Sequence, residues 1–158
     1  MKATVNWRGK LEFIGTADTT GFPVQMDSIS TAAGGAGASP MELIALGLAG
    51  CTAMDVISIL QKKQQKVTSF DVQVDAARAP EPPKVYTSAV LTYVITGTRV
   101  EENALLRAIE LSVVRYCPVH AMLSQVFPID VLYEIYEEEE NGEKRLTHQG
   151  AWQEMPQE

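Results

Sequence analysis

The stretch that decides the fold is Ser-Pro-Met-Glu-Leu-Ile-Ala-Leu-Gly-Leu-Ala-Gly-Cys-Thr-Ala-Met-Asp-Val, residues 39–56. Its start carries helix signals, because Ser39 suits the N-cap, Pro40 suits the first helical position, and Glu42 can complete a capping box. Apolar side chains then occur on every side of the predicted helix until the polar run at residues 61–66. Because a helix that is apolar all round is covered on several sides, we expect a long, buried central helix.

This helix is also about as long as a membrane span, which needs roughly 20 apolar residues. Glu42 and Asp55 interrupt the apolar run, and an acidic side chain in hydrocarbon costs about 3 kcal/mol on insertion scales. We therefore expect a helix buried in protein and no membrane partner. A second subunit could supply part of the cover, which is a physical reason to expect a homodimer.

The segments around the helix alternate between polar and apolar residues in the manner of strands. A glycine-rich loop is predicted at residues 31–38, between the early strands and the helix. The predicted strands are residues 2–8, 11–16, 24–27, 68–77, 85–96 and 129–136.

A second helix is predicted to start at a capping box formed by Thr98 and Glu101 and to end near Arg115. A short third helix follows at residues 119–126. The order β-β-β-α-β-β-α-α-β indicates an α+β domain. We place this domain at residues 1–136 and expect an acidic and polar C-terminal tail at 137–158.

Composition limits the class of protein. The 158 residues suit one domain, and 46% are hydrophobic, which is enough for a buried core. The net charge of −7 argues against a nucleic-acid partner, because binding to phosphates needs clustered Lys and Arg. Residues 1–13 lack the apolar core of an export signal, so we expect a cytoplasmic protein whose cysteines stay reduced.

Cys51 lies in the middle of the predicted helix. A free cysteine in such a place often acts only as a small hydrophobe, and this interpretation stays open. Its neighbours along the helix are small: Gly47, Ala49, Gly50 and Ala53. Small neighbours let a substrate or another side chain approach closely, which makes Cys51 a candidate reactive thiol.

Cys117 precedes Pro118 and is predicted to be the N-cap of the short third helix. A helix N-terminus stabilises an anion and can lower the pKa of a thiol. Arg115 and His120 lie within one helical turn and could add positive charge. The alternative is an N-cap residue without chemistry, and the sequence leaves both interpretations open.

Asp55 lies one helical turn after Cys51, on the same helix face. A carboxylate there disfavours the thiolate of Cys51. This effect on the Cys51 thiolate would be smaller if Asp55 were paired with a cation or belonged to a hydrogen-bond network. The sequence does not decide between these cases.

Metal binding is the competing use for the two cysteines and for the two histidines, His120 and His148. No pair among these residues has C-x-x-C or zinc-hook spacing. We therefore expect neither a metal site nor a cofactor.

Two segments carry a resemblance to known proteins: the helix at residues 39–56 and the run Arg-Tyr-Cys-Pro-Val at 115–119. Both resemble the cysteine sites of the OsmC/Ohr family. Within that family, Cys-x-x-x-Asp-Val-x-Ser-Ile-Leu-Gln-Lys at 51–62 is most similar to the YhfA-like branch. The resemblance extends over about residues 1–136, in element order and in the separation of the cysteines.

The resemblance implies an OsmC-like fold, with antiparallel sheets and a long buried central helix, assembled as an intertwined homodimer with active sites at the subunit interface. It also implies a peroxidase cycle in oxidative-stress defence. Cys51 would attack a peroxide as thiolate and become a sulfenic acid, and Cys117 would condense with it to a disulfide. Organic hydroperoxides would be the substrates, and a thiol reductant that the sequence does not identify would reset the pair.

The chain departs from the family pattern near the helix start. Peroxidase members carry Glu directly after the proline, where this chain has Met41 and places its acid at Glu42. One residue rotates a helical side chain by about 100°, and Glu42 also suits the capping box. Arg8 is the only arginine before Arg78, so it is the candidate there for the family's activating arginine.

Together these residues predict a thiol-dependent hydroperoxide reductase, that is, an OsmC-like redox protein. Its predicted catalytic pair is Cys51 and Cys117, and the candidate supporting residues are Glu42, Asp55, Arg8 and Arg115. The alternative is a non-catalytic protein of the same fold that binds a small apolar ligand at the dimer interface.

Overall fold

The first 46 residues form a compact unit of their own. A computed structural model describes residues 1–28, 37–139 and 141–153 of the chain. In the first unit, β1 (Ala3–Gly9), β2 (Glu12–Ala17) and β3 (Pro23–Met26) form an antiparallel sheet in that order. This confirms the predicted opening strands, whereas the glycine-rich loop predicted at 31–38 lies mostly outside the described residues.

Helix α1 (Pro40–Lys62) begins in the first unit and continues into the second, which starts at residue 47. The other helical elements of the second unit are α2 (Glu102–Leu111), the π-helical turn η1 (Ser112–Tyr116) and α3 (Pro118–Leu123). Its strands are β4 (Lys66–Arg78), β5 (Tyr86–Thr98), β6 (Ile129–Glu138) and β7 (Lys144–Trp152).

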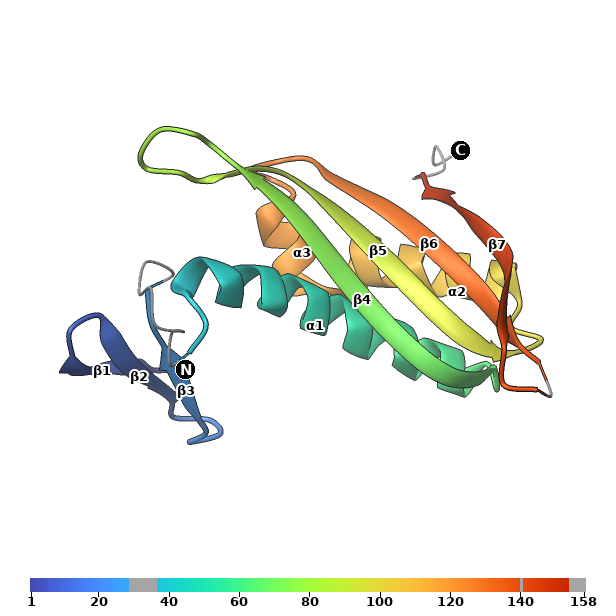
Figure 1. The fold of residues 1–158 in the computed structure, drawn as a ribbon, viewed down its shortest axis with the longest axis horizontal. Coiled ribbons are helices and arrows are strands. Elements are labelled where there is room, and N and C mark those ends of the chain that lie inside the picture. Colours follow the sequence, from blue (N-terminus) through green and yellow to red (C-terminus); the bar gives the residue numbers. More distant parts are fainter. Residues whose placement is uncertain (29–36, 140, 154–158) are drawn as a thin grey trace. The chain divides into compact units, whose positions relative to one another are not determined.

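These strands form one sheet in the order β4-β5-β6-β7 (Figure 1). The predicted α+β class is confirmed, but the sheet is not purely antiparallel, because β5 and β6 run parallel. A parallel pair needs a crossover connection, and the segment from α2 to α3 provides it.

The core of the second unit lies on one face of this sheet. Tyr93 of β5 pairs with Tyr133 of β6, and alternate residues along each strand share a face. Figure 1 shows α2 running behind the sheet, and side chains of α1 and α2 complete the core. Its fully buried members include Val56, Leu60, Leu91, Tyr93, Ile95, Leu105, Ala108 and Ile109.

Helix α1 is covered in this chain along a single stripe. Its buried residues are Leu48, Thr52, Val56 and Leu60, which follow one another at intervals of four. Met54, between them in sequence, is 73% exposed. By length and composition α1 is also apolar enough to cross a membrane. Cover on all sides, expected from its composition, is therefore not provided by the described residues of the second unit.

The start of α2 differs from the prediction. Thr98 ends β5 instead of capping the helix, because Arg99 turns the chain in the left-handed region at φ 54°. Glu101 is the N-cap and makes no side-chain capping bond. Its backbone N–H instead donates to Oε1 of Gln65 at 2.8 Å, a partner that local sequence spacing does not indicate.

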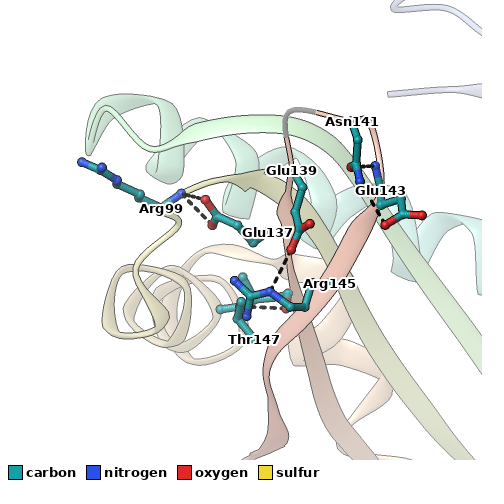
Figure 2. A network of polar contacts seen from close by, with 8 residues as sticks. Arg99, Glu137, Glu139, Asn141, Glu143, Arg145 and Thr147 are labelled. Carbon is teal, nitrogen blue, oxygen red and sulfur yellow. Dashed lines mark hydrogen bonds and ion pairs between the residues drawn. The ribbon is translucent and has the colours of Figure 1, made fainter.

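The expected C-terminal tail is largely a strand. Residues 144–152 form β7 and pair antiparallel with β6. In the hairpin between them, Nε of Arg145 contacts Oε1 of Glu139 at 3.0 Å and Thr147 donates to the Ile135 carbonyl at 3.0 Å (Figure 2). The polar composition of this segment suggested a tail, but pairing with β6 satisfies the backbone groups on one side of the strand.

Candidate active site

The structure brings the two cysteines together in the second unit. Cys51 lies half-buried on α1, and Cys117 is 2% exposed at the start of α3. Both are free thiols, and Cys51 lies close enough to Cys117 to raise the pKa of its thiol. Two residues that are far apart in the sequence therefore share one site.

The π-helical turn η1 positions Cys117. Its backbone N–H donates to the carbonyl of Ser112 at 2.8 Å, five residues earlier, which is the wider spacing of a π-helix. Pro118 then starts α3, and the N–H of His120 donates to Sγ of Cys117 at 3.3 Å. The predicted N-cap position of Cys117 is confirmed.

Of the two interpretations left open for Cys117, the one with a lowered pKa is not supported. Burial raises the pKa of the Cys117 thiol to about 12, and the nearby Cys51 side chain contributes to the rise. The backbone N–H groups of His120 and Val119 lower it, but by less. A helix of six residues has only a weak N-terminal field, so desolvation dominates.

Neither of the two side chains expected to add positive charge near Cys117 is described in that role. Arg115 is exposed, and its guanidinium carbon lies 5.6 Å from the centroid of the Tyr116 ring, within the range of a cation–π contact. Burial lowers the pKa of His120, which favours the neutral imidazole. The Cys117 sulfur therefore sits in a neutral and largely dry environment.

A chain of buried hydroxyl groups lies next to the thiols. Oγ1 of Thr52 is hydrogen-bonded to the hydroxyl of Tyr93 on β5 and, at 2.8 Å, to Oγ of Ser112. Oγ of Ser112 donates to Oδ2 of Asp55 at 3.0 Å. Burial raises the pKa of Tyr93 above its usual range, and Cys117 and Asp55 add to the rise.

Sequence reasoning found Asp55 but missed the three hydroxyl groups linked to it, of which Ser112 is its direct partner and Thr52 and Tyr93 follow in the chain. Ser112 continues the apolar face of α2 and is fully buried, and a buried polar group needs a partner. A serine on the apolar face of a predicted helix was therefore the sequence signal that could have indicated a buried hydrogen-bond network. Among the open alternatives for Asp55, the hydrogen-bond network is the one observed, and no ion pair of Asp55 occurs within residues 1–28, 37–139 and 141–153.

The other two candidate supporting residues lie in the first unit. Glu42 forms the predicted capping box, accepting from the Ser39 N–H at 2.6 Å, while its own N–H donates to Oγ of Ser39 at 3.2 Å. The bond from the Ser39 backbone lowers the pKa of Glu42. Arg8 lies exposed on β1. These positions give Glu42 a structural role at the start of α1.

Within the described residues, no group of three or more His, Cys, Asp or Glu side chains could hold a metal ion. The arrangement of Cys51 and Cys117 suits thiol–disulfide chemistry instead, because both thiols are free and Cys51 is near enough to affect the pKa of Cys117.

Comparison with known proteins identifies the family. A family model described as OsmC-like protein matches residues 33–131. The chain belongs to the OsmC-like protein family. Protein YhfA of Escherichia coli K12 is 36% identical over 135 residues, covering 85% of this chain and 98% of YhfA. This agrees with the YhfA-like resemblance of residues 51–62.

Solved structures show the same fold. An OsmC-like protein from Mycoplasma pneumoniae matches with a TM-score of 0.72 at 19% identity, over 85% of this OsmC-like chain and 95% of the other. The organic hydroperoxide resistance protein OhrB of Bacillus subtilis matches with a TM-score of 0.56 at 17% identity, over 83% and 96% of the two chains. At these identities the likeness concerns the fold.

Proposed function

We propose that this OsmC-like protein is a thiol-dependent reductase of organic hydroperoxides. The observation that carries the proposal is the proximity of a half-buried thiol, Cys51, to a buried thiol, Cys117, whose pKa it helps to raise. Fold relatives that are named organic hydroperoxide resistance proteins support the substrate class.

In the proposed cycle the Cys51 thiolate attacks an oxygen of the hydroperoxide. The O–O bond breaks, an alcohol leaves after taking up a proton, and Cys51 becomes a sulfenic acid. Cys117 then attacks the Cys51 sulfur, the S–O bond breaks, and a disulfide and water form. An external dithiol of unidentified structure reduces the disulfide by thiol exchange.

The different environments of the two thiols support this division of roles. A peroxide must reach the attacking sulfur, and Cys51 is the more exposed of the two. Cys117 stays protonated at neutral pH, because burial raises its pKa to about 12. A protonated thiol is a poor first nucleophile, but it is protected until a sulfenic acid forms beside it.

Intact-mass measurement after one equivalent of an organic hydroperoxide tests the cycle. The wild-type protein is expected to lose two hydrogens and both titratable thiols, because Cys51 and Cys117 form a disulfide. Cys117→Ser is expected to gain one oxygen atom at Cys51 instead, since no resolving thiol is present. If both thiols of the wild type survive the peroxide, the chain is not a peroxidase, and the ligand-binding alternative gains support.

We also propose that the working form is a homodimer in the reducing cytoplasm. Large exposed apolar side chains lie on the segments that carry the two cysteines: Met54, Val114, Tyr116, Met122 and Val126. Large exposed apolar side chains are common at protein–protein interfaces. A second subunit would supply the cover that α1 lacks, and two free thiols suit a reducing compartment.

Light scattering coupled to size exclusion tests the dimer. Met54→Lys is expected to weaken association by about 2 kcal/mol or more, because it places a charge in an apolar interface. Leu146→Lys is the matched control, since Leu146 is 40% exposed on β7, away from the cysteine-bearing segments in sequence. A monomeric wild type at micromolar concentration contradicts the proposal, as does an equal effect of both substitutions.

A further inference from the structure

Ser112 ties Cys117 to two helices of the second unit. Its carbonyl accepts the Cys117 N–H at 2.8 Å, which closes the π-helical turn η1. Its own N–H donates to two carbonyls of α2. Its Oγ donates to Oδ2 of Asp55 at 3.0 Å and is hydrogen-bonded to Oγ1 of Thr52 at 2.8 Å, and both of these partners lie on α1. The backbone of Cys117 is therefore linked to α1 through one buried side chain.

The partners of Ser112 lie in the part of α1 that carries Cys51. Thr52 follows Cys51 directly, and Asp55 lies one helical turn further, on the same face as Cys51. A helical turn is held by its own backbone hydrogen bonds, so Cys51 moves together with these two residues. The bonds that fix Ser112 to α1 therefore also fix the backbone of Cys117 relative to that of Cys51.

The hydroxyl groups of this network fix one another's orientation. A carboxylate only accepts hydrogen bonds, and each hydroxyl has a single proton to donate. Ser112 gives its proton to Asp55, so Thr52 donates to Ser112, and Tyr93 of β5 donates to Thr52. All three hydroxyl-bearing side chains are fully buried, where a hydroxyl that loses its partner is costly. The network therefore favours a single arrangement of α1, β5 and η1.

The segment that carries Cys117 has little stability of its own. A π-helix is rare and occurs mostly as a single turn. The five residues of η1 are followed directly by the six residues of α3, and isolated helices this short are marginal in water. Without the bonds from Ser112 to α1, Cys117 would sample more positions, and forming a disulfide would have to restrict them.

We propose that Ser112, Thr52 and Asp55 are positioning residues that hold Cys117 where it forms a disulfide with Cys51. The loss of freedom that the disulfide requires then occurs when the chain folds, which raises the effective concentration of each thiol at the other. The three residues need not touch a substrate, because they act through the place of Cys117. The proposal rests on the proposed function for the pairing of the two cysteines, but it concerns the disulfide and not the peroxide.

Equilibration of the full chain with reduced and oxidised glutathione at neutral pH measures this effective concentration. Cys51 and Cys117 lose two electrons and two protons and form one S–S bond, while glutathione disulfide takes them up and becomes two glutathione thiols. Intact mass distinguishes the dithiol from the internal disulfide by two hydrogens and so gives the equilibrium constant. A chain that is inert to peroxide can still be measured in this way, so failure of the peroxidase cycle and failure of the positioning role are distinguishable.

Ser112→Ala and Ser124→Ala are matched substitutions. Ser112→Ala removes both side-chain bonds to α1, and we expect the equilibrium constant to fall about tenfold, which makes the potential of the pair about 30 mV less negative. Ser124 lies at the end of α3, is exposed, and donates to the Ala121 carbonyl at 3.5 Å. Ser124→Ala should stay within about twofold of wild type. In concentrated urea all variants should give the same constant, because the unfolded chain has no network.

Thr52→Val and Thr52→Ser test the hydroxyl group itself. Thr52→Val keeps the shape of the side chain but removes the hydroxyl that Ser112 and Tyr93 share, and the constant should fall by at least about threefold. Thr52→Ser keeps the hydroxyl and should stay within about twofold of wild type. Asp55→Asn keeps an oxygen that accepts from Ser112 and should stay within about threefold, which separates positioning from the charge of the carboxylate.

A purely structural role predicts a different pattern. It lowers the free energy of unfolding of the dithiol and disulfide forms alike, and the equilibrium constant stays the same. Unchanged constants in Ser112→Ala and Thr52→Val therefore overturn the proposal, as does an equal loss in Thr52→Ser and Thr52→Val. A loss in Asp55→Asn as large as that in Ser112→Ala, or a wild-type chain that forms no internal disulfide, also overturns it. If Ser112→Ala does not fold, as judged by its thermal transition, the two Thr52 variants decide.

Discussion

Replacing Cys51 with serine is expected to lower the rate of hydroperoxide reduction by at least about a thousandfold. A serine hydroxyl is not ionised at neutral pH and is a far weaker nucleophile toward peroxide oxygen than a thiolate. The second thiol cannot take over, because Cys117 is 2% exposed and burial raises its pKa to about 12. Single-turnover consumption of an organic hydroperoxide, followed at several protein concentrations, measures the loss.

Cys117→Ser is the matched control for this experiment. It should keep the first oxidation within a few-fold of wild type, because the attacking thiol remains, but it should turn over poorly with a dithiol reductant. If Cys117→Ser abolishes the first oxidation while Cys51→Ser retains it, the roles are reversed. Such a result would favour the local argument from the helix N-terminus over the effect of burial.

Gly97→Ala is expected to lower the free energy of unfolding by about 3 kcal/mol. Gly97 lies buried near the end of β5, opposite an irregularity in β4. A Cβ at this position would lie 2.1 Å from the Lys66 carbonyl oxygen and 2.7 Å from a methyl group of Val100. The nearest obstacle is backbone and cannot rotate away, so β4 and β5 must separate locally.

Gly47→Ala provides the same chemical change in open space. A Cβ there meets no atom within 4 Å, and alanine in a helix is favoured over glycine by about 0.5–1 kcal/mol. Urea unfolding at equal protein concentration should therefore give shifts of opposite sign for the two variants. A Gly97→Ala protein as stable as wild type would show that β4 and β5 do not approach as closely as described.

Residues close together in the sequence determined the local elements of this protein. Ser39, Pro40 and Glu42 predict where α1 begins, and both capping-box bonds are present at 2.6 and 3.2 Å. Pro118 likewise predicts that Cys117 is the N-cap of α3. Such features depend on neighbours within one helical turn, which the sequence displays directly.

Features that depend on distant partners were predicted less well. The capping box at Thr98 and Glu101 does not form, because β5 extends to Thr98 and Gln65 binds the Glu101 N–H at 2.8 Å. The strand at residues 144–152 exists because β6 offers an edge with which it pairs. The residues around Glu101 do not indicate that Gln65 is its partner, and residues 144–152 do not indicate that β6 is theirs.

The same division applies to the thiol pair. The sequence alone identified the two cysteine segments and placed them on α1 and at the start of α3. It also carried the OsmC-like resemblance, which the family match confirms. Tertiary structure decided the electrostatics of the site. Burial among α1, β5 and η1 raises the pKa of Cys117, although its local position suggested the reverse. Desolvation depends on every segment that excludes water from the sulfur, whereas capping depends only on the next few residues.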